Sequence, residues 1–246
     1  MNATTIPTNG SGDALADSIE HLYKAFSAYP LSISPPCACC HEPEEEKRLS
    51  SAPLRELSPE HLKTFATDAL LTWGSEPEYK HFLPRILELT ATDGFRSWPD
   101  IQILIGRLGH AKWQTWPEEE RAAIEAFLLA YWEEGFEYES AQNRGGCMED
   151  LLCAIAMTDQ DLTPYLAKWF TSDTRFDHLT EWLLEGDHSL SGGYWEDASE
   201  TRKDQVRAWF KSDELRGKYN ALAGESASEE EKDRFLRALE VLSAVS

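Results

Sequence analysis

Apolar residues recur at helical spacing along almost the whole chain, and this pattern constrains the fold more than any other feature. In the clearest stretch, one apolar face repeats every three or four residues, as an amphipathic helix requires. The residues of that face are Leu62, Phe65, Ala66, Ala69, Leu70 and Trp73. No stretch alternates convincingly between apolar and polar residues, as a half-buried strand would. The sequence therefore predicts an all-α, multi-helical fold.

The clearest helix boundaries surround that stretch. Ser58 before Pro59 is typical of an N-cap followed by a first-turn proline, whose missing N–H would have no partner there. Gly74 stands where a left-handed residue closes a helix without a steric clash. We therefore expect one helix from Pro59 to Trp73.

A second helix start follows at Ser75, and Pro84 is expected to disturb it. A proline inside a helix removes a backbone donor and clashes with the preceding turn. The sequence therefore predicts a short turn over 77–82 and a new or kinked helix over 85–90.

Similar apolar stripes mark further helices on both sides of this region. An acidic first turn at Glu118–Glu120 opens the longest of them and complements the positive end of the helix. The other expected helices lie around residues 15–26, 101–108, 151–155, 162–170, 176–183, 206–210, 215–222 and 235–242.

Breaks in the helical pattern divide the chain. Residues 1–12 are rich in Thr, Asn and Gly and are expected to be flexible. An N-terminal helical half over 13–142 includes a Cys-rich loop at 30–53, and the Gly-rich break at 143–146 ends it. A C-terminal helical half over 147–246 is expected to pack on the first.

One five-residue motif occurs twice, and this internal echo favours a helical repeat. Trp-Phe-Thr-Ser-Asp at 169–173 returns as Trp-Phe-Lys-Ser-Asp at 209–213, forty residues later. Stacked helical pairs of the HEAT type have a similar period. Two short copies also arise by chance, since Ser and Asp are common caps, so an irregular bundle is the alternative.

The formal charge of −21 narrows the range of partners. Such a surface repels phosphate backbones and anionic headgroups, which argues against DNA, RNA and membrane binding. It suits a basic protein partner, or it serves solubility alone. Nine Trp, eight Tyr and ten Phe indicate a folded globule rather than an acidic disordered chain.

The cytoplasm is the simplest compartment for this chain. No segment approaches the roughly 20 apolar residues that span a bilayer, and the first residues lack the basic and apolar regions of a signal peptide. Five cysteines, an odd number with three of them crowded together, do not look like a disulfide framework.

Several motifs in the first half resemble a known family. The loop Cys37–Cys40, followed by LRELSPEHL, TWG and FLPRILEL, is similar to a family of uncharacterised bacterial proteins. The resemblance implies a soluble bacterial protein without an established activity, and it supplies no catalytic residues.

The first candidate metal site is the only place in the sequence where soft ligands are concentrated. Its members are Cys37, Cys39, Cys40 and His41. Zinc takes four ligands in a tetrahedron, and structural sites usually combine two separated pairs. A short loop cannot wrap all four ligands around one ion, so His61 or His81 would have to help. Cys147 and Cys153 look like core thiols.

A second set of candidate ligands lies near one expected helix end. His178, Glu181 and Glu185 share a helix face, and Asp187 and His188 follow it. A hydrolytic metal site can be drawn from these residues. The alternative is a solvated acidic helix face, which suits a chain so rich in glutamate.

Two residue pairs are candidates for partner contact. Arg85 and Glu88 lie three apart on one helical face, where they either meet a partner or form a surface ion pair. Tyr194 and Trp195 follow a Gly-rich loop, where they either anchor a partner or cover the core.

The motifs of common nucleotide-binding and hydrolytic enzymes are absent from the sequence. The charge and the helical stack favour a non-enzymatic, acidic protein that binds another protein. A concrete version is an immunity-type protein that neutralises a basic toxin or nuclease. A zinc-binding protein organised on the Cys37–His41 loop is the first alternative. An unrecognised enzyme is the second.

Overall fold

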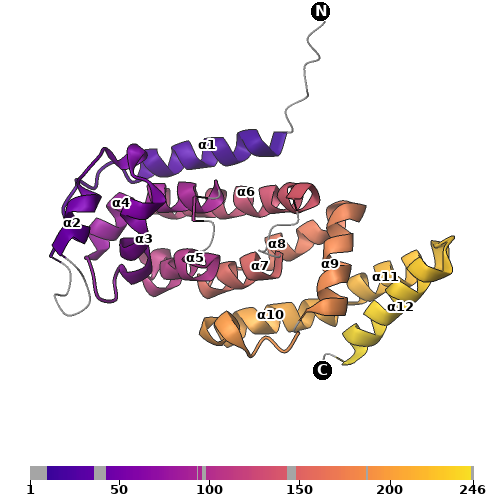
Figure 1. The fold of residues 1–246 in the computed structure, drawn as a ribbon. Coiled ribbons are helices and arrows are strands. Elements are labelled where there is room, and N and C mark those ends of the chain that lie inside the picture. The colour runs from indigo at the N-terminus through magenta and orange to yellow at the C-terminus, as the bar shows by residue number, and fades with distance from the viewer. Residues whose placement is uncertain are drawn as a thin grey trace, which may run out of the picture. The chain divides into compact units, whose positions relative to one another are not determined.

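The protein folds into helices throughout the part that the structure, a computed structural model, describes. The described residues are 10–35, 43–92, 94–95, 98–142, 148–186 and 188–244. They contain helices and one isolated bridge between Ala69 and Trp73, and no strand. The predicted all-α fold is confirmed. The chain divides into two compact units, Met1–Tyr138 and Glu139–Ser246, whose elements Figure 1 labels.

Unit 1 is organised around one helix, α4, which packs against α1, α3 and α5. The α-helices of this unit are α1 Gly10–Ala25, α2 Pro43–Leu49, α3 Pro59–Asp68, α4 Glu76–Ala91, α5 Ile101–His110 and α6 Glu118–Gln142. Two 3₁₀ helices join them, η1 Leu54–Glu56 and η2 Trp113–Thr115. Large side chains that solvent does not reach fill the core, among them Phe82, Trp113, Phe127 and Trp132.

The first helix boundary is as predicted, and the second is wrong. Helix α3 begins at Pro59 after the N-cap Ser58, but it ends at Asp68 instead of Trp73. The Asp68 carbonyl accepts hydrogen bonds from three backbone N–H groups, including that of Trp73, in a tight turn. This turn places the Trp73 ring edge-on against Phe65, with 5.5 Å between the ring centroids. Burial of an aromatic ring thus outweighs another turn of helix.

The short turn expected over 77–82 and the new helix start expected at 85 are also wrong. Helix α4 runs without a break from Glu76 to Ala91 with Pro84 inside it, so residues 77–82 are helical. At its start, the Glu78 carboxylate accepts a hydrogen bond from the Ser75 backbone N–H at 2.7 Å, which closes a capping box. Burial of Phe82, Leu83 and their neighbours on this helix offsets the donor that proline lacks.

Two segments expected to be irregular contain helix. Residues 10–12 belong to α1, while residues 1–9 lie outside the described part. The segment 30–53 contains α2, which has Glu44, Glu45 and Glu46 in its first turn and two cations in its last. These charges complement the helix dipole at both ends, and the buried Leu49 attaches the helix to unit 1.

The described part of unit 2 is also built from α-helices and 3₁₀ helices. They are α7 Met148–Met157, α8 Thr163–Leu166, η3 Ala167–Thr171, α9 Asp173–Glu185, η4 Gly193–Asp197, α10 Glu200–Phe210, α11 Asp213–Glu225 and α12 Glu229–Ala244. Helices α11 and α12 pack on each other, and α12 also packs on α9. The single helix predicted over 162–170 is wrong, because one turn of α8 passes directly into the tighter η3, where Trp169 is fully buried.

The internal echo has a structural counterpart in its caps. The Ser172 hydroxyl accepts a hydrogen bond from the Arg175 N–H, and the Ser212 hydroxyl accepts one from the Leu215 N–H, both at 3.3 Å. The elements before these caps differ, since η3 precedes the first and α10 the second. The HEAT-like repeat therefore stays a prediction.

Glycines in unit 2 provide a matched pair of stability tests. A Cβ on Gly186 would lie 2.3 Å from Trp182 Cδ1 and 2.7 Å from the Trp182 carbonyl oxygen, whereas a Cβ on Gly217 would meet nothing within 4 Å. We expect Gly186→Ala to lower the free energy of unfolding by about 1–3 kcal/mol through overpacking. Gly217→Ala, in the exposed interior of α11, is expected to raise it by about 1 kcal/mol.

Urea titration of both variants measures these free energies. Because the same methyl group is added in each, a shift of the same sign in both would contradict the packing around Gly186.

Candidate functional site

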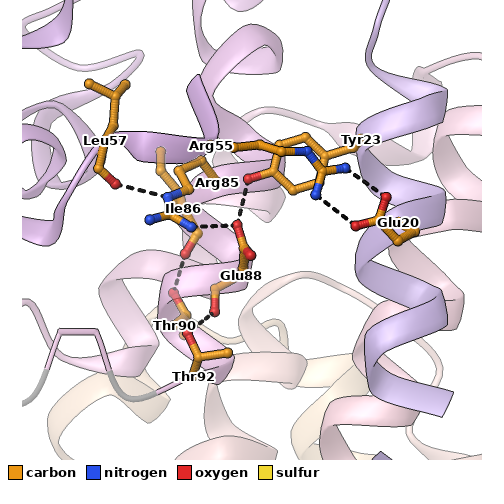
Figure 2. A network of polar contacts seen from close by, with 9 residues as sticks. All are labelled: Glu20, Tyr23, Arg55, Leu57, Arg85, Ile86, Glu88, Thr90 and Thr92. Atoms are coloured by element: carbon orange, nitrogen blue, oxygen red, sulfur yellow. Dashed lines mark hydrogen bonds and ion pairs between the residues drawn. The ribbon is translucent and has the colours of Figure 1, made fainter. Parts of the chain in front are cut away.

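Arg85 and Glu88, the predicted partner-binding pair, lie in a polar network on α4 (Figure 2). Arg85 Nη1 lies 2.7 Å from Glu88 Oε2, and Arg85 Nε donates to the Leu57 carbonyl at 2.8 Å. The Tyr23 hydroxyl of α1 donates to the same Glu88 oxygen at 2.6 Å. The side chains are 16% and 23% exposed. They do form an ion pair, but a partly buried one that joins α1 and the chain after η1 to α4.

A second arginine extends the network to the surface. Arg55 forms a bidentate contact with Glu20 at 2.6 and 2.7 Å, and its guanidinium stacks on the Tyr23 ring at 3.7 Å from the centroid. Burial, and then the hydrogen bond to Glu88, raise the pKa of Tyr23 well above its ordinary value. Tyr23 therefore stays protonated at neutral pH and acts as a donor, not as a general base.

A buried ion pair between Lys80 and Glu120 involves the N-terminal half of α4. The Lys80 and Glu120 side chains are 5% and 7% exposed and lie 2.9 Å apart. Lys80 Nζ is also 3.1 Å from Glu76 Oε1 and 3.2 Å from the Tyr29 hydroxyl, which itself donates to Glu120. Two carboxylate oxygens and one hydroxyl oxygen therefore lie within 3.2 Å of the ammonium group.

The surroundings of Lys80 keep it charged. Burial alone would lower the pKa of Lys80, but its hydrogen bonds to Glu120, Glu76 and Tyr29 outweigh burial and raise it. The Trp116 ring, 4.2 Å from Nζ, adds a cation–π contact. A lysine held in this way is a structural cation and a poor nucleophile, because nucleophilic lysines need a lowered pKa.

Glu78 attaches the beginning of the Cys-rich segment 30–53 to α4. This 3% exposed residue accepts hydrogen bonds from the N–H and hydroxyl groups of both Ser34 and Ser75. The Ser34 carbonyl in turn accepts from Trp73 Nε1 at 2.9 Å. Burial would raise the pKa of Glu78, but these hydrogen bonds outweigh it and hold the pKa below its ordinary value.

The depressed pKa of Glu78 predicts a pH-dependent contribution to stability. Because the folded-state pKa lies below the unfolded one, the stabilisation is complete above the unfolded value and is lost as the pH falls through the folded one. We expect Glu78→Gln to lower the free energy of unfolding by about 2 kcal/mol at pH 7, and the gap to wild type to narrow as the solution is acidified below pH about 4.

Urea titrations at several pH values test this prediction, and Glu60→Gln is the matched control. Glu60 pairs with Lys63 in an exposed contact, so this variant should stay within about 1 kcal/mol of wild type at every pH. A gap for Glu78→Gln that widens on acidification would contradict the prediction.

The candidate zinc site stays a prediction, because its four proposed ligands lie outside the described residues. Cys37, Cys39, Cys40 and His41 lie outside the described part, as does Cys147. Of the two suggested helper ligands, His61 Nδ1 accepts from the Ser58 N–H at 3.1 Å, and His81 Nδ1 donates to the Tyr29 carbonyl at 2.8 Å. The described residues contain no group of three potential ligands that could hold a metal ion.

Cys153 behaves as a core thiol. It is free and 2% exposed, and burial, followed by nearby carboxylates, raises its pKa to about 12. A thiol with so high a pKa is unreactive at neutral pH.

The second candidate cluster separates around the end of α9. Glu181 lies 4.0 Å from Arg234 of α12, so it has a cationic partner within its unit. His188 Nε2 donates to the Trp182 carbonyl at 2.8 Å. Asp187 lies outside the described residues. Within them, His178 and His188 belong to no group of three potential ligands that could hold a metal ion.

The aromatic pair in η4 is divided between core and surface. Trp195 is 6% exposed and η4 packs against α7, so this ring belongs to the core of unit 2. Tyr194 is half-buried. The placement of Trp195 agrees with the alternative in which the aromatic pair covers the core.

The sequence did not predict the buried polar contacts of unit 1 that Tyr23, Glu78 and Lys80 make. A Ser-x-x-Glu capping signal was present at Ser75 and Glu78 and pointed to a helix start. No local signal joins Lys80 to Glu120 or Tyr23 to Glu88, because these pairs are far apart in the sequence.

Within the described residues, none of the helices combines the length and the apolar content needed to cross a membrane. A scan against protein-family models and searches of curated proteins and solved structures give no match to this chain.

Proposed function

We propose that this protein is a non-enzymatic binding protein whose acidic surface takes a basic protein partner. The observation that supports the proposal is the uneven distribution of its negative charge. Residues 118–200 contain twenty Asp and Glu against four Lys and Arg, whereas residues 201–246 contain nine of each kind. Charge concentrated in this way attracts a basic surface over long range and speeds encounter.

Exposed carboxylates within the acidic stretch are the proposed contact residues. In unit 1, Glu118, Glu119 and Glu125 of α6 are exposed, and in unit 2 so are Glu196 and Asp197 of η4. These side chains lie on regular elements, so a partner meets them without first ordering a loop.

The acids of α9 are less suited to this role. Asp173 lies 3.9 Å from Lys218, and Asp177 lies 2.9 Å from Arg234, so cations of α11 and α12 already balance them within unit 2. A partner would have to compete with these contacts.

The most concrete form of the proposal is an immunity-type protein that neutralises a basic toxin or nuclease. Such a protein acts by covering its target, which agrees with the partner class that the charge favours. Electrostatic steering of this kind weakens as salt screens the charges.

The test is native mass spectrometry of the tagged protein captured from its own cell extract at low salt. We expect a basic protein at fixed stoichiometry, and we expect less of it as the salt concentration rises. Capture that does not depend on salt, or capture without any basic protein, would overturn the proposal.

Two charge variants locate the contact. In the first, Glu118, Glu119 and Glu125 are replaced by Gln. The matched control replaces Glu214, Glu225 and Glu240, which are equally exposed but lie in the electrically balanced C-terminal stretch. We expect the first variant to capture much less of the basic partner and the control to capture as much as wild type. Equal losses in both variants would mean that the partner responds to the net charge and not to the carboxylates of α6.

A further inference from the structure

We draw no further inference here: the strongest candidate, the exposed small-residue face of α11 at Gly217, Ala221 and Gly224, carries nothing because nothing in the structure shows what covers it.

Discussion

Lys80→Met is expected to lower the free energy of unfolding by about 3 kcal/mol at pH 7, since it leaves a buried carboxylate without its cation. Glu120, whose side chain is 7% exposed, then keeps the Tyr29 hydroxyl as a donor but loses the positive charge of Lys80. Methionine has nearly the length of the lysine stem, so little packing is lost, and the effect reports the charge.

A double variant separates the charge from the packing. Lys80→Met combined with Glu120→Gln removes both charges and keeps an acceptor for Tyr29, so it is expected to recover most of the lost stability. Lys63→Met, which breaks the exposed pair with Glu60, should cost less than about 1 kcal/mol.

Urea titration followed by circular dichroism measures all three variants. If the substitutions at Lys80 and Lys63 lowered the free energy of unfolding equally, the Lys80–Glu120 contact would not be buried in solution. Helix α4 would then not be the centre of unit 1. A double variant no more stable than Lys80→Met would show that the loss comes from packing.

The helical class was predictable because its signal is local and repeated. Amphipathic spacing marks a helix wherever one face is buried. Ser58 before Pro59, or three glutamates in the first turn of α6, place a helix start without knowledge of the rest of the chain. These features need no contact with a distant residue, so the sequence alone contains them.

The errors in the fold share a tertiary cause. The turn after Asp68 exists because Trp73 packs on Phe65, and α4 continues through Pro84 because both its faces are buried in unit 1. In each case packing overrides a local preference, because the free energy of helix propensity is small compared with that of burying a large apolar side chain.

The candidate site was less predictable for the same reason. Arg85 and Glu88 were recognised as a pair from their spacing, but their partners Tyr23 and Leu57 come from other segments and decide that the pair faces inward. A spacing rule gives the pair and does not give its surroundings.

Trp169→Ala is expected to cost unit 2 about 4 kcal/mol, because it removes the centre of a stack of three indole rings. The Trp169 ring centroid lies 5.2 Å from that of Trp209 and 5.7 Å from that of Trp182, with an interplanar angle of 26° in both pairs. Solvent does not reach Trp169, so the substitution leaves a large cavity and also ends two ring contacts.

The control for this prediction is Trp98→Ala. Trp98 is 49% exposed, so the same truncation there should cost less than about 1 kcal/mol.

Should Trp169→Ala prevent folding altogether, Trp169→Phe keeps an aromatic ring and is expected to cost about half as much, since less volume is lost. Circular dichroism of the folded Phe variant should also lose the coupling signal of stacked indoles. An unchanged circular dichroism signal would contradict the close spacing of the rings. Equal losses of unfolding free energy for Trp98→Ala and Trp169→Ala would contradict the burial of Trp169.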